Sequence, residues 1–237
     1  MRIFVTGDTH SDLSRFSFKK FPEGRTLTKD DIMIVLGDFG CVWFNEKSAN
    51  YSGEQRNLAW LNEKPWTTVF VDGNHENFDR LNALPVVDFC GGKAHQIASS
   101  IFHLMRGECF TFNGKKFLAM GGANSIDKEG RTVGKSWWKE ELLSRADEEH
   151  VLDTLEKLKY NVDYILTHTV PTSLKPAIES YLGGKIHGIE EDPTEKFLEH
   201  VMSQMNFNHH YFGHFHLYMP NLDALHTGLY HEIVELK

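Results

Sequence analysis

The sequence is organised by short apolar runs, most of which end at a glycine. The runs are rich in β-branched and aromatic residues, and their length is typical of buried strands. They are RIFVTG, DIMIVLG, TTVFVDG, KKFLAMGG, VDYILTH and HHYFGH. Helical patterns fall between several of them, at residues 54–63, 136–144, 146–159 and 193–205. This alternation of strand and helix predicts an α/β fold.

Three further strand-like runs have no helix between them. IFHLM (101–105) and CFTFN (109–113) are expected to form a hairpin, and LYHEIVEL (229–236) adds another strand. Strands joined without a crossover helix can pair in the antiparallel sense, so a mixed sheet system is predicted. The 237 residues are 41% hydrophobic and can bury a substantial core. A single domain spanning residues 1–237 is therefore expected.

Side chains that can bind a metal follow five of the predicted strands. In open α/β sheets the carboxyl ends of the strands face one crevice, so residues far apart in sequence can share a site. Asp8 and His10 are two residues apart, as are His214 and His216, and such pairs point to the same side of an extended segment. The polar residues that follow the strands are Asp8, His10, Asp38, Asn74, His75, Glu76, His168, His214 and His216.

Seven of these side chains would provide mixed oxygen and nitrogen ligation. They are Asp8, His10, Asp38, Asn74, His168, His214 and His216. Such a donor set suits Mn, Fe, Zn or Co better than Mg or Ca. Seven donors exceed what one ion with an open position would use, but they suffice for two ions ~3.5 to 4 Å apart that share a carboxylate. Two divalent transition-metal ions are expected, with Mn preferred and Fe, Zn or Co as alternatives.

Charge and cysteine content limit the classes of partner and compartment. The net charge of −8 argues against general binding to nucleic-acid backbones, although bound metal ions would make the crevice itself cationic. The three cysteines show no C-x-x-C spacing, which favours a reduced compartment. The N-terminal apolar run is too short for a signal peptide, and no apolar stretch approaches the ~20 residues of a membrane span. A cytoplasmic protein is expected, with no membrane contact and no protein partner implied.

The motifs GDTH, LGDFG, VDGNHE, ILTH and YFGHFH occur in this order along the chain. They resemble the signature of the calcineurin-like metallophosphoesterases, which runs GD-x-H, GD, GNH[DE], a lone His after a strand, and GH-x-H. The resemblance spans residues 7–216. It implies two packed mixed β-sheets flanked by helices on both outer faces, a four-layer αββα sandwich.

The resemblance also implies a role for each polar residue. One ion is assigned to Asp8, His10 and His216, the other to Asn74, His168 and His214, and Asp38 bridges the two. His75 is then free to face the substrate phosphate as general acid or transition-state stabiliser, and Glu76 is expected to hold its second ring nitrogen. The expected reaction is hydrolysis of a phosphomonoester or phosphodiester, in a small phosphate ester or nucleotide, by a metal-bridging hydroxide.

The sequence departs from the protein-phosphatase branch of this family. That branch continues its second motif as GD-x-VDRG, with a phosphate-binding arginine, whereas the chain reads GDFGCVWF. The same branch lacks the GH-x-H ending, so the chain resembles the phosphodiesterase-like side. A protein Ser/Thr phosphatase and a non-catalytic metal-binding interaction module on the same fold remain as alternatives. Because all ligand positions and His75 are present, an enzyme is favoured.

The loop at residues 121–138 follows the KKFLAM strand and is a candidate for substrate binding. Its polar candidates are Asn124, Arg131 and Lys135, and the two cationic side chains are the nearest substitutes for the missing arginine. The alternative is a polar surface loop that leads into a helix capped by Ser136. A second loop, residues 170–191, includes His187 and would be either a lid or, as favoured, a tolerated insertion.

Three further residues, His209, His210 and Cys41, are expected to have structural roles. His209 and His210 precede the GHFH motif but are expected to be strand residues, because seven donors already fill the site. Cys41 is expected to be a packed thiol rather than a catalytic one.

Overall fold

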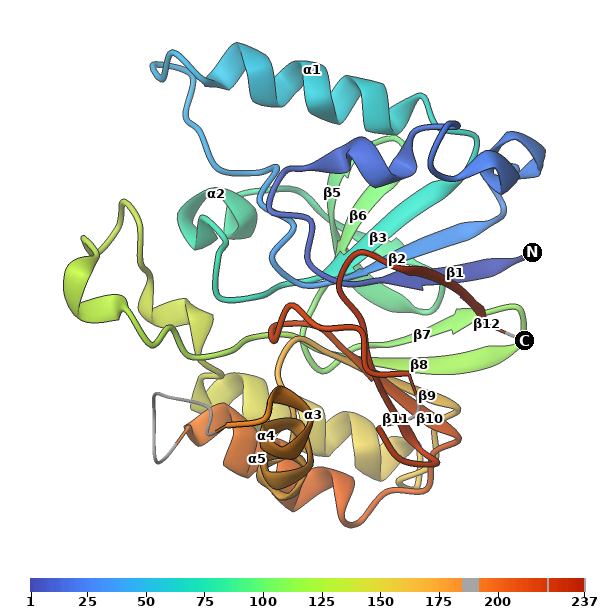
Figure 1. Cartoon of the computed structure of the whole chain (residues 1–237), viewed down its shortest axis with the longest axis vertical. Helices are drawn as coiled ribbons and strands as arrows, with labels where there is room; N and C mark the ends of the chain where they lie inside the picture. Colours follow the sequence, from blue (N-terminus) through green and yellow to red (C-terminus); the bar gives the residue numbers. More distant parts are fainter. Residues whose placement is uncertain (185–191, 221, 237) are drawn as a thin grey trace.

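The strands form two β-sheets that pack face to face (Figure 1). The computed structural model describes residues 1–184, 192–220 and 222–236. Within these residues, the first sheet has seven strands in the order β12-β1-β2-β3-β6-β5-β4. The bounds of these strands are β1 Ile3–Thr6, β2 Ile32–Leu36, β3 Thr67–Val71, β4 Val86–Phe89, β5 Gly92–Ala98, β6 Ile101–Leu104 and β12 Ile233–Leu236.

The second sheet has, among the described residues, five strands in the order β11-β10-β9-β8-β7. Their bounds are β7 Cys109–Phe112, β8 Lys115–Met120, β9 Tyr164–Thr167, β10 His209–Phe212 and β11 His226–Gly228. β8 to β11 run parallel, whereas β7 is antiparallel to β8. In the first sheet β1, β2, β3 and β6 are parallel and the outer strands are antiparallel. The predicted mixed sheets are confirmed.

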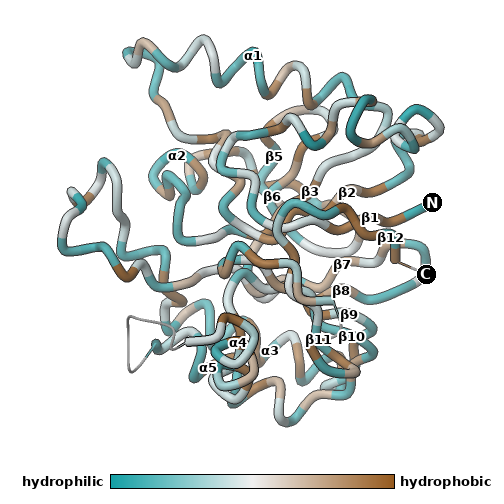
Figure 2. The backbone as a smooth tube through the Cα atoms, viewed as in Figure 1, coloured by the Kyte–Doolittle hydropathy of each residue, from teal (hydrophilic) through white to brown (hydrophobic). Residues whose placement is uncertain are grey.

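The central strands are apolar on both faces because both faces are covered. In β1, Ile3 and Val5 join the core between the two sheets, while Phe4 joins the core under the helices of the first sheet. A strand buried on both sides needs apolar residues at odd and even positions, which explains the unbroken apolar runs of the sequence. Figure 2 shows the hydrophobic segments along the strands and hydrophilic segments along the outer turns of the helices.

Helices lie on the outer face of each sheet (Figure 1). α1 (Tyr51–Asn62) and α2 (Phe78–Asn82) pack on the first sheet. α3 (Arg145–Lys157), α4 (Lys175–Leu182) and α5 (Pro193–Met202) pack on the second. The predicted four-layer arrangement is confirmed. No helix within the described ranges has the length and hydropathy that crossing a bilayer would require.

The predicted hairpin of residues 101–105 and 109–113 is wrong. β6 pairs with β3 in the first sheet, whereas β7 pairs with β8 in the second, so the chain crosses between sheets at residues 105–108. Gly107, with a φ of +78°, adopts the left-handed conformation that this sharp turn needs. Strands β4, β5 and β11 were not predicted.

The predicted helix at residues 136–144 is also wrong, because this segment forms turns and one short 3-10 segment, Lys139–Glu141. Its carbonyl groups bond to a side chain instead of to a helical turn: Arg106 donates to the carbonyl oxygens of Glu140 (2.8 Å) and Leu142 (3.0 Å). The helix begins later, at Arg145, where Ser144 and Asp147 form a reciprocal capping box.

Candidate metal centre

The loops after β1, β2, β3, β9 and β10 meet where the two sheets join, and glycines allow their close approach. A Cβ atom on Gly73 would lie 2.1 Å from Oδ1 of Asp38, and one on Gly213 would lie 2.2 Å from Oδ1 of Asp8. Real Cβ atoms do not approach so closely, so each glycine makes room for a carboxylate from another strand. This explains the glycines of the VDGNHE and YFGHFH motifs.

One group of donors consists of Asp8, His10, Asp38 and His216, whose ligand atoms all lie within 4.8 Å of one another. Nε2 of His216 is 3.1 Å from Oδ2 of Asp8 and 2.9 Å from Nε2 of His10. Two carboxylates, both buried, thus converge with two imidazole nitrogens. The number and chemistry of these donors fit a divalent transition-metal ion.

A second group lies on the other side of Asp38. Nε2 of His168 is 3.1 Å from Oδ1 of Asn74 and 3.4 Å from Oδ1 of Asp38. Nδ1 of His168 is 2.7 Å from the carbonyl oxygen of Leu36, which holds a proton on Nδ1 and turns Nε2 toward Asn74 and Asp38. The His214 ring packs edge-on against His168, with 4.9 Å between ring centroids.

Asp38 therefore touches both groups. Its Oδ2 is 3.6 Å from Nε2 of His10, and its Oδ1 accepts a hydrogen bond from the backbone N–H of His75 at 2.7 Å. Burial by itself would raise the pKa of Asp38, but His168 outweighs it and holds that pKa well below its usual range. The carboxylate remains ionised in the interior, which is the state that metal ligation would require.

Several of the expected ligands have a left-handed backbone, which is uncommon for residues other than glycine. The φ angles are +43° at His10, +44° at Asp38, +67° at His214 and +53° at His216. The expectation that residues two apart point the same way from an extended segment is therefore wrong: Asp8 and His10 do lie in one group, but His216 joins that group while His214 packs on His168. Backbone strain, held by the surrounding structure, turns these side chains toward one another.

His75 faces a cavity of about 360 Å³ beside the donors. The cavity is lined by both sides of the site, including Asp38, Asn74 and His214, and by the loop at residues 121–138. Arg131 from this loop places its Nη1 3.0 Å from Nδ1 of His75. The loop thus reaches the crevice, as its substrate-binding interpretation requires.

The other two candidates of this loop differ in position. Asn124 is buried and lines the cavity. Lys135 is exposed and is not among the lining residues. Of the two cations expected to replace the arginine that the GDFGCVWF segment lacks, Arg131 lines the cavity and Lys135 does not.

The expected contact between Glu76 and the ring of His75 is wrong. The buried Glu76 carboxylate accepts hydrogen bonds from the backbone N–H groups of Phe39 (2.7 Å) and Gly40 (3.3 Å). It therefore stabilises the loop that follows Asp38, and Arg131 is the residue beside the imidazole. Adjacent residues of a chain point in different directions, so Glu76 turns inward where His75 turns toward the cavity.

Two residues of the cavity wall were not predicted from the sequence. Phe215 lies between the two histidines of GH-x-H, and its place inside a ligand motif was an available signal. Ile126 is 66% exposed in a polar loop, and an exposed aliphatic side chain at a crevice is a feature to look for.

His209, His210 and Cys41 have the structural positions that were expected for them. His209 and His210 lie in β10, where their Nε2 atoms contact Thr227 (2.9 Å) and Thr167 (2.7 Å). Cys41 is buried in the core, and burial raises the pKa of its thiol. The loop expected at residues 170–191 is wrong in part, because Lys175–Leu182 form α4; the segment after Gly184, including His187, lies outside the described residues.

Comparison with known proteins gives a family and a fold. Residues 1–218 match the family model described as calcineurin-like phosphoesterase. The lariat debranching enzyme of Saccharomyces cerevisiae is 25% identical over 193 residues, which cover 73% of this chain and 45% of that enzyme. Lariat debranching enzyme A of Xenopus laevis is 26% identical over 198 residues, covering 73% and 34%. The chain thus spans less than half the length of these relatives.

A solved structure supports the fold. The Thermus thermophilus protein TT1561 superposes with a TM-score of 0.50 at 14% identity, covering 99% of this chain and 97% of that one. The match of the family model extends over all the strand-end motifs, and these motifs bring carboxylate and imidazole donors together in the structure. The chain belongs to the calcineurin-like phosphoesterase family, whose members hydrolyse phosphoester bonds.

Proposed function

We propose that the chain is a dinuclear metal-dependent phosphoesterase that hydrolyses a small phosphate ester or a nucleotide. The observation that carries the proposal is the position of Asp38 between two groups of donors, within 3.6 Å of His10 and 3.4 Å of His168. Two divalent ions, Mn preferred and Fe, Zn or Co as alternatives, would supply an activated water and neutralise phosphoryl charge when bound there.

Two side chains of the cavity, Arg131 and His75, would bind the phosphoryl group and donate a proton. Arg131 is the cation nearest His75 and presents a planar set of donors that matches phosphoryl oxygens. His75 lies between this guanidinium and Asp38, where it can give a proton to the departing oxygen. The hydrogen bond from the backbone N–H of His75 to Asp38 holds the imidazole beside the proposed metal ligands.

The organic part of the substrate would lie against an apolar wall. Ile126 and Phe215 line the same cavity as Arg131, and both are hydrophobic. A cavity of about 360 Å³ suits a small molecule better than a folded protein surface. This combination favours an ester whose alcohol carries an aliphatic or aromatic group, such as a nucleoside.

The curated relatives add a second substrate class to be tested. Both are lariat debranching enzymes, so a lariat belongs among the candidate substrates. The net charge of −8 predicts that the chain does not bind nucleic acid generally, and any such substrate would have to be recognised at the crevice itself.

The test is reconstitution of the chelator-stripped protein with each metal, followed by elemental analysis and activity assays. The assays compare phosphomonoesters, phosphodiesters, nucleotides, phosphopeptides and a lariat. We expect two ions per chain and activity that is lost on chelation and returns with metal. One ion or none would contradict the dinuclear proposal, and two ions without turnover of any substrate would favour the non-catalytic alternative.

A further inference from the structure

A buried pair of residues, Ser125 and Glu141, lies behind the proposed metal ligand Asn74. Nδ2 of Asn74 donates to Oγ of Ser125 at 3.0 Å, and that hydroxyl donates to Oε2 of Glu141 at 2.8 Å. The backbone N–H of Ser125 donates to Oε1 of Glu141, also at 2.8 Å. Glu141 is fully buried. Its carboxylate is therefore held inside the protein by Ser125.

The chemistry of these groups fixes the direction of every hydrogen bond in the chain. A carboxylate only accepts, so the Ser125 hydroxyl must donate to Glu141 and has only lone pairs left for Asn74. The amide must then present its NH₂ group to Ser125 and its oxygen to the metal site. Oδ1 of Asn74 does lie 3.1 Å from Nε2 of His168. An amide facing the other way would offer hydrogens, which cannot bind a cation.

We propose that Glu141 and Ser125 are positioning residues that hold Asn74 in its metal-binding orientation. The proposal rests on the proposed function, because it requires Asn74 to be a ligand. Among the described residues, Ser125 is the hydrogen-bond partner of Nδ2 of Asn74. Orientation of this ligand therefore depends on a carboxylate that touches neither the ions nor the substrate.

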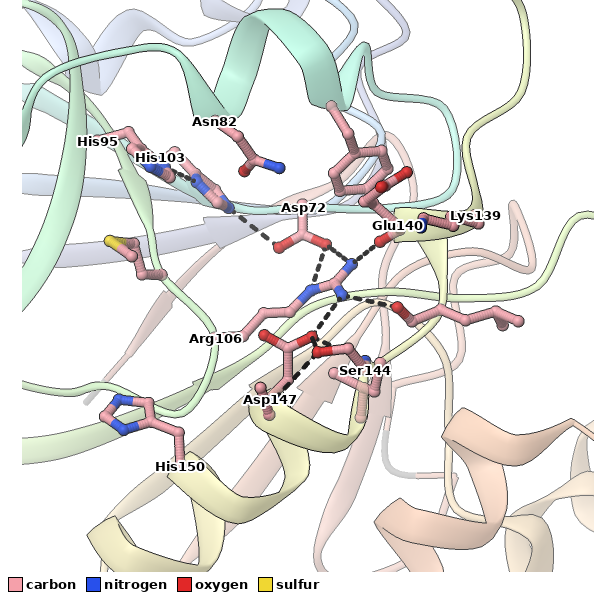
Figure 3. Close-up of a pocket in the computed structure, with 15 residues that line it drawn as sticks. Asp72, Asn82, His95, His103, Arg106, Lys139, Glu140, Ser144, Asp147 and His150 are labelled. Atoms are coloured by element: carbon pink, nitrogen blue, oxygen red, sulfur yellow. Dashed lines mark hydrogen bonds and ion pairs between the residues drawn. The ribbon is translucent and has the colours of Figure 1, made fainter. Parts of the chain in front are cut away.

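The guanidinium of Arg106 links the segment around Glu141 to Asp72 (Figure 3). Arg106 donates to Asp72 through Nε at 2.9 Å, and its guanidinium also holds the carbonyl oxygens of Glu140 and Leu142, on either side of Glu141. Asp72 lies two residues before Asn74, and its carbonyl oxygen accepts from the N–H of Gly122 at 2.9 Å. Both ends of the segment at residues 121–141 are thus tied to Asp72, which follows β3 and lies two residues before Asn74.

The experiment is calorimetric titration of the chelator-stripped protein with Mn²⁺. Glu141→Gln keeps the size of the side chain but adds hydrogen-bond donors. The hydroxyl of Ser125 can then donate to Asn74, so the side-chain amide of Asn74 is free to turn its NH₂ group toward the metal site. Ser125→Ala removes the partner altogether. We expect each variant to bind one of two ions ~10- to 100-fold more weakly, the usual cost of losing an orienting partner. The other ion, held by Asp8, His10 and His216, should bind unchanged.

Two controls separate orientation from folding. Glu140→Gln makes the same charge change at the neighbouring residue, which contacts Arg106 through its backbone carbonyl oxygen, and should leave both affinities unchanged. Asn74→Asp offers oxygen whichever way it faces, so the double variant Asn74→Asp/Glu141→Gln should recover the second ion. Thermal unfolding of each apo protein checks that it is folded.

The outcomes are distinguishable. If the wild-type protein binds fewer than two Mn²⁺ ions, the dinuclear function itself fails. If the wild-type protein binds two and Glu141→Gln binds both equally well, the positioning role is overturned. It is also overturned if the loss in Glu141→Gln persists when Asn74 is replaced by Asp.

Discussion

Arg131 lies beside both ring nitrogens of His75, with Nη1 3.0 Å from Nδ1 and Nη2 3.2 Å from Nε2. Asp127 contacts the guanidinium at 2.8 Å and keeps it in this place. Burial lowers the pKa of His75, and the charge of Arg131 lowers it further although Asp38 opposes both. A phosphoryl group entering the cavity would meet this guanidinium first, which separates the task of binding phosphate from the task of transferring a proton.

Replacement of Arg131 by Ala should weaken substrate use without removing metal. A hydrogen bond to a charged group contributes about 1.5–3 kcal/mol, so we expect kcat/KM to fall by ~10- to 100-fold. Steady-state kinetics on the preferred substrate and elemental analysis of the same preparation measure the two effects. The guanidinium is not a metal ligand, so the metal content should match that of the wild-type protein.

The comparison variants for Arg131 are Lys135→Ala and Arg145→Ala. Lys135 belongs to the same loop but is exposed outside the cavity, and we expect a smaller loss there. Arg145 is an exposed arginine of α3 paired with Glu149, so its removal controls for the loss of positive charge. Unchanged kinetics in Arg131→Ala would contradict a substrate-binding role for the loop at residues 121–138 and favour the interpretation as a polar surface loop.

Asp38→Asn should impair both metal sites at once. The carboxylate contacts His10 on one side and His168 on the other, and an amide cannot give oxygen donors to two ions. We expect elemental analysis after reconstitution to show fewer than one ion per chain. His216→Ala is the matched variant, because it removes a ligand that lies in only one group, and it should retain the other ion. Loss of one ion alone in Asp38→Asn would remove Asp38 from the bridging position.

The convergence of the candidate donors was predictable because it depends on a local pattern. A buried strand that stops at glycine and continues with Asp, Asn or His places those residues at the carboxyl edge of a sheet, and the topology brings the edges together. The alternation of strand and helix and the apolar character of both strand faces likewise follow from nearby residues. The two mixed sheets needed the family resemblance as well.

Other features depend on contacts between residues far apart in sequence. The direction of Glu76 is set by backbone N–H groups of a loop 37 residues earlier, and the helix expected at 136–144 is replaced by turns because Arg106 takes its carbonyl groups. Ser125 and Glu141 are recognisable only through the hydrogen-bond directions that they impose on Asn74. A left-handed backbone at residues such as His214 is also invisible to an argument from strand periodicity.

The buried His95 should make stability depend on pH. Burial, with help from His103, lowers the pKa of His95 from 6.5 to about 4 in the folded state. Between these values the unfolded chain binds the proton and the folded chain does not, so the free energy of unfolding decreases as the pH falls. From His95 alone we expect a loss of ~2 kcal/mol between pH 7 and pH 5, measurable by urea unfolding.

His95→Asn tests this assignment because an amide can replace Nδ1 in the contact with Nδ1 of His103 (3.0 Å) but does not titrate. The variant should lose about that much of the pH dependence, whatever its absolute stability. His200→Asn, at an exposed position of α5, should keep the wild-type slope. If the free energy of unfolding of His95→Asn depended on pH as steeply as that of the wild-type protein, a group other than His95 would be responsible.

His75 is the residue proposed to protonate the departing oxygen, and its removal should depend on the substrate. An alkyl phosphate or a natural diester leaves as a poor alkoxide, for which proton transfer contributes roughly 10² to 10⁴ in rate, whereas a nitrophenyl ester can leave unaided. We therefore expect His75→Ala to lose much more activity on the first kind of ester than on the second. Both ions should remain bound, because the proposed ligands are its neighbour Asn74 and residues of other loops. Equal losses on both esters would instead assign His75 to binding or stabilising the phosphoryl charge together with Arg131, and loss of metal would place it among the ligands.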